Sequence, residues 1–135
     1  MFVSTSLALL EEASTRLVCV DVGSAGGFHP RLNSVRSRAD LIGFEVDPEE
    51  YDRLTRTAGD GERYIREALG RDGESVTLRL ARKRTCSSLY LPDQKKLSKF
   101  PNPDRVLTDQ EIKMTTRSLD TICKTGAIKR IDYLK

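Results

Sequence analysis

The chain has 135 residues, of which 38% are hydrophobic and 32% are charged. This length fits one domain with its own core, and the composition excludes a disordered or fibrous protein. The net charge is only +3, and no strand interleaves aromatic with basic residues, so the sequence does not indicate a nucleic-acid-binding protein.

Cysteine spacing and the N-terminal residues indicate where in the cell the protein is expected. Cys19, Cys86 and Cys123 are an odd number of cysteines without C-x-x-C spacing. This pattern favours reduced thiols and a cytoplasmic location, and it predicts neither a disulfide framework nor a metal site. The apolar residues 7–10 follow no basic residue and precede two glutamates, so we expect no signal peptide and no membrane span.

The first part of the chain alternates predicted helices with predicted strands. Apolar residues recur at helical spacing over 4–14, and an apolar run over 16–22 is typical of a strand buried on both faces. A glycine-rich turn follows, then helical spacing over 32–39 and a second apolar run over 40–45. This alternation predicts a parallel α/β unit.

The residues after the second strand predict a capped helix. Asp47 is a suitable N-cap, Pro48 suits the first helical position, and Glu50 completes a capping box. Gly59 and Gly61 then end the helix.

The rest of the chain predicts short strands and one long irregular segment. Residues 62–69 are expected as a third strand, and residues 74–80 alternate apolar with polar residues as a half-solvated antiparallel strand does. Three prolines between residues 81 and 110 discourage a long element, and loops of this length are often lids or binding segments. Further short elements are expected at residues 111–116 (strand), 119–123 (helix) and 131–135 (strand). The fold class is therefore α/β, a mostly parallel sheet with an antiparallel addition, in a single domain over 1–135.

A candidate ligand site lies where the first two strands end. Asp21 ends the first strand, three glycines follow within residues 23–27, and Glu45 ends the second strand. Ligands of open α/β sheets bind beyond the carboxyl ends of the strands, and an acid at the end of the second strand can accept hydrogen bonds from both hydroxyls of a ribose. The pattern therefore predicts a nucleoside-containing ligand.

The spacing of the glycines bears on which nucleoside binds. A dinucleotide site has the pattern G-x-G-x-x-G, but Ala25 and Phe28 occupy two of its glycine positions. An NAD(P)-dependent oxidoreductase is therefore the disfavoured alternative. A non-catalytic binding module with the same fold, using residues 81–110, is a further alternative.

Six motifs in register resemble the FkbM family of class I S-adenosyl-L-methionine-dependent methyltransferases. They are residues Asp21–Gly27, Gly43–Pro48, Ala68–Gly70, Cys86–Leu89, Ser118–Ile122 and Ile131–Lys135. The resemblance covers nearly the whole chain from Leu17, and it implies a Rossmann-like fold and methyl transfer, with oxygen the expected acceptor, to an unidentified small molecule or sugar.

The resemblance also implies roles for individual residues. The glycine turn would face the methionine part of S-adenosyl-L-methionine, with Asp21 fixing the turn or the amino group. Glu45 would bind the ribose, and the other strand ends would border the adenine. The residues implied to bind the cofactor are Asp21, Gly23, Ser24, Ala25, Gly26, Gly27, Glu45, Val46, Ala68 and Leu69. The structural alternative for Asp21 is an acid that only accepts backbone hydrogen bonds.

The end of the chain departs from the family pattern. In the FkbM family the strand that residues 131–135 match continues into an acidic, glycine-containing motif where substrate and methyl group meet. Lys135 is the last residue here, so we expect an incomplete domain that lacks its C-terminal strands, with no catalytic residue assigned. An uncovered sheet edge would favour self-association.

Other polar residues have two interpretations each. His29 suits a loop residue better than a base, and the hydroxyls of Ser87 and Ser88 can bind ligand or cap a turn. Asp120 and Lys135 can line the pocket or form an ordinary ion pair. The basic group around residues 79–84 is interpreted as a solvated face, and neither a nucleic-acid nor a membrane partner is expected.

Overall fold

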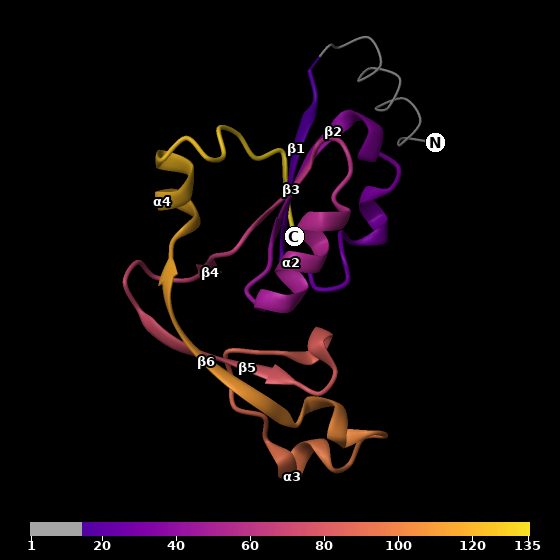
Figure 1. Ribbon diagram of the computed structural model, residues 1–135, viewed down its shortest axis with the longest axis vertical. Helices are drawn as coiled ribbons and strands as arrows, with labels where there is room; N and C mark the ends of the chain where they lie inside the picture. The colour runs from indigo at the N-terminus through magenta and orange to yellow at the C-terminus, as the bar shows by residue number, and fades with distance from the viewer. Residues whose placement is uncertain (1–14) are drawn as a thin grey trace. The chain divides into compact units, whose positions relative to one another are not determined.

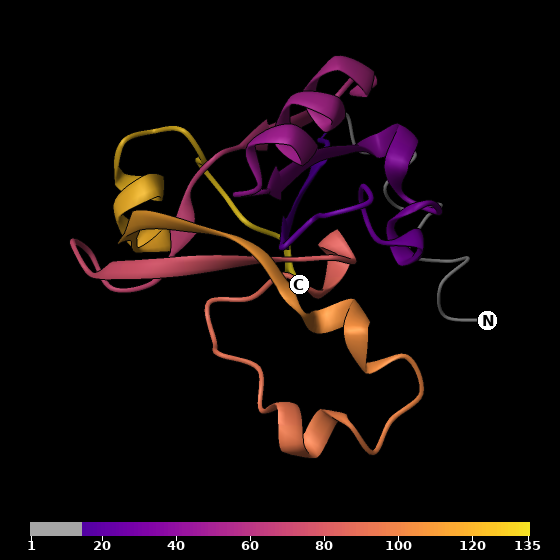
Figure 2. The ribbon, with the colours of Figure 1, turned by 60° about the horizontal axis from the view of Figure 1, so that its bottom comes forward.

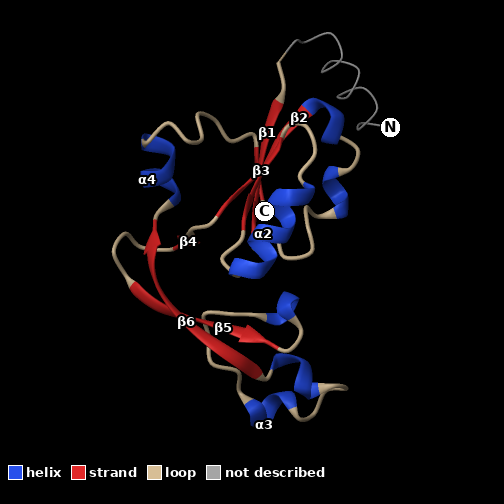
Figure 3. Cartoon of the chain, viewed as in Figure 1, coloured by secondary structure: helices blue, strands red, loops and turns tan. Residues whose placement is uncertain are grey.

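The computed structural model describes residues 15–135, so the helix predicted over 4–14 lies outside the described residues. The chain forms two compact units. Unit 1 contains the chain up to Glu67 together with residues 123–135, and unit 2 contains residues 68–122. Each unit has a sheet of its own (Figures 1 and 3). The chain therefore has an α/β fold with a mainly parallel sheet in unit 1 and a small mixed sheet in unit 2.

Unit 1 is built on four parallel strands. They are β1 (Leu17–Val22), β2 (Ala39–Phe44), β3 (Glu62–Ile65) and β7 (Tyr133–Leu134). Their order is β3-β2-β1-β7, and every neighbouring pair is parallel. Because β2 and β3 lie on one side of β1 and β7 on the other, the direction of strand addition reverses at β1. This reversal is where open α/β sheets bind ligands.

The connection between β1 and β2 is not the helix predicted over 32–39. It contains two 3-10 turns, η1 (Pro30–Leu32) and η2 (Arg36–Arg38), and Ala39 already belongs to β2. Sixteen residues, 23–38, connect the end of β1 with the start of β2, and the two 3-10 turns hold three residues each. The helical spacing arises instead from burial of Leu32 and Ala39 in the core.

The predicted capped helix is confirmed, but the predicted capping box is wrong. Helix α2 (Pro48–Thr57) begins after Asp47, whose side chain accepts a hydrogen bond from the Glu49 N–H. The Asp47 N–H donates to Glu45 Oε1 and not to Glu50. Glu50 instead accepts a bond from Gly26, because the turn after β1 lies beside the first turn of α2.

Unit 2 is a small mixed sheet. Its strands are β4 (Ala68–Leu69), β5 (Ser75–Ala81) and β6 (Thr108–Arg117), in the order β4-β6-β5. β5 and β6 are antiparallel, which confirms the predicted antiparallel strand, and Leu78 and Leu80 are buried as its alternation predicted. The short helix α4 (Leu119–Lys124) follows β6, and Ser118 caps it by accepting the Thr121 N–H.

The single strand predicted over 62–69 is wrong. It is divided into β3, which pairs with β2, and β4, which pairs with β6 in the other sheet. The division falls at Arg66 and Glu67, between the residues that pair with β2 and those that pair with β6. Gly70 also fits closely against β6, where a Cβ atom would meet the Thr116 side chain at 2.9 Å.

Residues 82–107 contain no long element, as the prolines predicted. Their only regular pieces are η3 (Arg84–Cys86), α3 (Gln94–Leu97) and η4 (Pro103–Val106). Ser87 and Ser88 bond backbone N–H groups of Ala81 and Tyr90, so both hydroxyls act as turn caps in this structure.

Within residues 15–135, no helix has the length and the apolar character needed to cross a membrane.

Candidate functional site

The candidate site lies at the carboxyl ends of β1 and β2, where the glycine turn of residues 23–27 begins. Gly23, Gly26 and Gly27 have φ angles of +73°, +87° and +100°, which side chains rarely adopt. A Cβ atom added at Gly23 or Gly26 would meet nothing within 4 Å. The backbone of the turn is therefore open to close approach by a ligand.

Most amide groups of this turn are already used within the protein. The N–H groups of Gly23 and Ser24 both donate to Phe44 O at 3.0 Å, and Gly27 N donates to Ser24 O at 2.8 Å. Gly26 N donates to Glu50 Oε1 at 2.6 Å. Four of the five amides in residues 23–27 are thus engaged, and they do not form the array of unused donors that holds a phosphate.

Ser24 also fixes the turn to β2. Its side chain is buried and donates from Oγ to Phe44 O at 3.1 Å. Gly43 is the matching small residue on β2, because a Cβ atom there would meet Ser24 Oγ at 2.7 Å and the Tyr64 ring at 2.5 Å. Ser24, predicted to contact the cofactor, therefore has its hydroxyl directed into the protein.

Asp21 is fully buried at the end of β1, with 0% of its side chain exposed. Its Oδ2 accepts the His29 N–H at 3.0 Å, and its Oδ1 accepts Lys135 Nζ at 2.6 Å. Both oxygens are therefore engaged within unit 1 by partners outside residues 23–27, so the role of Asp21 in fixing the glycine turn stays a prediction. Lys135, which the sequence grouped with Asp120, lies in unit 1 and pairs with Asp21, whereas Asp120 belongs to unit 2.

His29 has a structural place beside this ion pair. Its Nδ1 accepts the Arg31 N–H at 3.2 Å and so caps η1. This arrangement fits the loop interpretation of His29 rather than that of a base.

Glu45 has a carboxylate oxygen with unused hydrogen-bonding capacity. The residue is only 5% exposed, and its Oε1 accepts the Asp47 N–H at 2.9 Å. Its Oε2 is buried and has no hydrogen-bond partner among the described residues. Burial raises the pKa of Glu45, an effect that the N–H groups of Asp47 and Val46 partly offset. Buried polar atoms are rarely left without a partner, so this oxygen is a candidate ligand contact.

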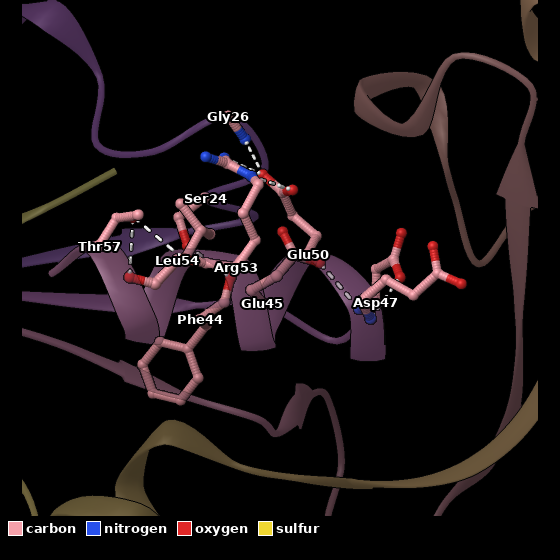
Figure 4. A network of polar contacts seen from close by, with 10 residues as sticks. Ser24, Gly26, Phe44, Glu45, Asp47, Glu50, Arg53, Leu54 and Thr57 are labelled. Carbon is pink, nitrogen blue, oxygen red and sulfur yellow. Dashed lines mark hydrogen bonds and ion pairs between the residues drawn. The ribbon is translucent and has the colours of Figure 1, made fainter.

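Glu50 links the glycine turn to α2 and was not predicted as a site residue (Figure 4). Its carboxylate accepts from Gly26 N and also pairs with Arg53, at 2.7 Å to Nη2 and 2.8 Å to Nε. Hydrogen bonding to Arg53 is the main cause that lowers the pKa of Glu50. Local sequence rules place Glu50 in a capping box, and only the long-range contact with Gly26 reveals its position.

The remaining predicted residues divide between the units. Val46 follows Glu45 directly and is half-buried in unit 1, and Ala25 lies within the turn. Ala68 and Leu69 form β4 of unit 2, and their role beside an adenine stays a prediction.

A cavity of about 700 Å³ lies elsewhere in unit 1. It adjoins the amino ends of β1 and β3, where Arg16 and Gly61 line it, and its apolar wall includes Val18, Ile42 and Ile128. None of the residues predicted to bind a cofactor lines it. Among residues 15–135, no three His, Cys, Asp or Glu side chains gather as metal ligands.

No family model matches the chain, and searches of curated proteins and of solved structures find no match either.

Replacing Glu50 with Ala is expected to lower the free energy of unfolding by about 1 kcal/mol, because the Gly26 N–H and Arg53 lose a charged acceptor. The pKa of Glu50 is lowered in the folded chain, so its contribution is complete above the ordinary value of 4.5 and is lost as the pH falls through the folded-state pKa. Urea denaturation at pH 7 and at lower pH measures both effects. Glu49→Ala, an exposed acid in the same helical turn, is the control. Equal losses in the two variants would contradict the prediction.

Proposed function

We propose that unit 1 binds S-adenosyl-L-methionine and that the protein is a Rossmann-like methyltransferase of the FkbM type. The observation that carries this proposal is the buried, unpartnered Oε2 of Glu45 at the end of β2. A ribose presents hydroxyl donors, and a carboxylate at this position of a parallel sheet can accept from them. The ligand would thereby supply the partner that this oxygen lacks.

The glycine turn supports this cofactor over a dinucleotide. A pyrophosphate needs unused N–H groups of the turn as donors, and the turn offers few because four amides are engaged within unit 1. S-adenosyl-L-methionine has no pyrophosphate, and open space beside Gly23 and Gly26 leaves room for its amino-acid part. An NAD(P)-dependent oxidoreductase is accordingly the weaker proposal.

The strand order supports the same placement of the ligand. The order β3-β2-β1-β7 reverses between β1 and β7, and Asp21 and Lys135 lie at that reversal. A ligand whose ribose lies at Glu45 would extend from the end of β2 across the end of β1. Its reactive part would then face the β1–β7 side of the sheet.

The proposed division of roles follows from this placement. When bound, S-adenosyl-L-methionine supplies an electrophilic methyl group. Glu45 accepts the ribose hydroxyls, and the glycine turn borders the amino-acid part. Asp21 accepts the His29 N–H of the segment that follows the turn and would act as a positioning residue. The methyl acceptor is proposed to be a small molecule or sugar bearing a hydroxyl group, and much of the rate would come from aligning it with the methyl group.

Calorimetric titration tests the proposal. The full chain is expected to bind S-adenosylhomocysteine and not NAD. Glu45→Ala is expected to weaken that binding about tenfold, since a charge-assisted hydrogen bond to a buried carboxylate is lost. Glu49→Ala, which removes an exposed acid four residues away, should leave the affinity unchanged. Binding of NAD alone, or equal affinities of the wild type and Glu45→Ala, would overturn the assignment of Glu45 to the ribose.

A further inference from the structure

The segment of residues 82–107, here named the basic loop, concentrates the positive charge of the chain. It holds seven basic and two acidic residues, a net charge of +5, although the whole chain carries only +3. The rest of the chain is therefore slightly acidic. Such segregation of charge is the electrostatic signature of a surface that meets an anionic partner.

Large apolar side chains are exposed in the same segment. Tyr90, Leu91 and Phe100 are 83%, 75% and 64% exposed. They flank α3, since Leu91 precedes it closely and the Phe100 N–H bonds Leu97 O in its last turn. Sequence spacing could not show that these apolar side chains are exposed. Their exposure changes the interpretation of the basic residues as a merely solvated face. Clustered exposed apolar groups mark interaction surfaces.

Three lysines lie between these apolar residues in the sequence. Lys95, Lys96 and Lys99 are all exposed on or beside α3. Lys96 pairs with the exposed Asp93 at 3.4 Å, while Lys95 and Lys99 have no ion pair among the described residues. Their charges are therefore available to a partner.

The basic loop is an anchored structure that leaves the sheet of unit 2. Its base is closed by bonds from Arg82 N to Leu107 O and from Lys83 N to Arg105 O, both 3.0 Å. Between these bonds the chain turns away from β5 and β6 and carries α3 at its far side (Figure 2). Apolar and basic side chains around α3 are thus presented together by a defined loop.

We propose that the basic loop docks on an anionic lipid membrane surface. Tyr90, Leu91 and Phe100 enter the interface between headgroups and acyl chains, and the lysines contact the lipid phosphates. Aromatic and aliphatic side chains flanked by lysines suit this interface, where both burial and charge attraction contribute. Nucleic acid is the competing anion, because bases can stack on Tyr90 and Phe100, whereas the aliphatic Leu91 suits acyl chains. This binding is peripheral and does not rest on the proposed cofactor site.

Vesicle sedimentation of the full chain tests the proposal. The probes are phosphatidylcholine vesicles with and without about one-third phosphatidylserine. We expect binding only to the anionic vesicles, and loss of binding in about 1 M salt, where the Debye length falls to about 3 Å. The triple variant Tyr90→Ser, Leu91→Ser and Phe100→Ser is expected to bind at least tenfold more weakly while unfolding at the wild-type urea concentration.

Two triple variants with the same net charge test whether vesicle binding depends on the lysines of the basic loop. Lys95→Glu, Lys96→Glu and Lys99→Glu together should abolish vesicle binding. The control changes the exposed residues Lys113, Lys124 and Lys129 to Glu, which alters the net charge equally but elsewhere, and should retain most of the binding. Equal losses in the two triple variants would overturn the proposal. So would binding of a labelled oligonucleotide without binding of anionic vesicles.

Discussion

Replacing Lys135 with Met is expected to lower the free energy of unfolding by about 2–3 kcal/mol. Lys135 Nζ lies 2.6 Å from Oδ1 of Asp21, whose side chain is completely buried. Removing the ammonium group leaves a buried carboxylate with only the His29 N–H as a partner. Breaking a fully buried ion pair in this way costs about 3–5 kcal/mol, and the partial exposure of Lys135 lowers the expected value to about 2–3 kcal/mol.

A double-mutant cycle separates this ion pair from other effects of the substitution. In Asp21→Asn with Lys135→Met no buried charge remains, so the double variant should lose less stability than the two single variants added together. Urea denaturation gives all four free energies. Lys129→Met, an exposed lysine in the same unit, should change the free energy of unfolding by less than about 0.5 kcal/mol. A Lys135→Met value equal to that of Lys129→Met would show that the ion pair does not stabilise the fold.

The same variants report on the glycine turn. Asp21 connects Lys135 to the His29 N–H, so loss of the lysine is expected to shift the amide resonances of His29 and Gly26 in a nuclear magnetic resonance spectrum. Gly73, in the turn before β5 of unit 2, serves as the internal reference. Shifts confined to unit 1 would indicate that Lys135 positions the turn in addition to stabilising it.

Local sequence patterns predict those elements of unit 1 whose apolar runs and capping residues are adjacent in the sequence. The apolar runs before Asp21 and Glu45 specify β1 and β2, and Asp47 with Pro48 specifies the start of α2. The 3-10 turns over 30–38 could not be predicted, because burial of Leu32 and Ala39 in the core produces helical spacing without an α-helix. The division of the strand predicted over 62–69 depends likewise on two different pairing partners, β2 and β6.

Prediction of the candidate site from the sequence likewise succeeds only where the signal is local. Asp21, Glu45 and the glycines were identified because motif positions and strand ends are visible in the sequence. Glu50 was missed because its bond to Gly26 joins residues 24 positions apart. Lys135 was assigned to the wrong partner, since its bond to Asp21 joins residues 114 positions apart. Contacts between side chains of separate elements require the register of the sheet, which spacing alone does not determine.

Replacing Glu45 with Gln is expected to raise the free energy of unfolding at pH 7 by about 1 kcal/mol. The carboxylate is buried, and its Oε2 has no partner among the described residues, so its ionised form costs stability. The amide of Gln retains an oxygen to accept the Asp47 N–H and carries no charge. A substitution at a binding site that stabilises the fold is typical of a residue retained for function.

The pH dependence gives this prediction a definite sign. Burial raises the pKa of Glu45 above its ordinary value of 4.5, so the folded chain takes up this proton more readily than the unfolded chain. As the pH falls through the raised pKa towards 4.5, the wild type gains stability and the advantage of Glu45→Gln disappears. Urea denaturation between pH 7 and 4.5 measures the difference, with the exposed Glu49→Gln as the control.

Glu45→Gln is expected to raise the free energy of unfolding and to lower the affinity for the ligand. If Glu45 served only the packing of the fold, its replacement would lower the free energy of unfolding and leave the affinity for S-adenosylhomocysteine unchanged. If Glu45 instead binds a ribose, the Glu45→Gln variant would be more stable than the wild type and would bind S-adenosylhomocysteine more weakly. The reason is that the ligand is the partner that the carboxylate lacks. Measured on the same protein sample, unfolding and calorimetry therefore distinguish a structural acid from a binding one, and a stability loss at pH 7 would contradict the proposed role.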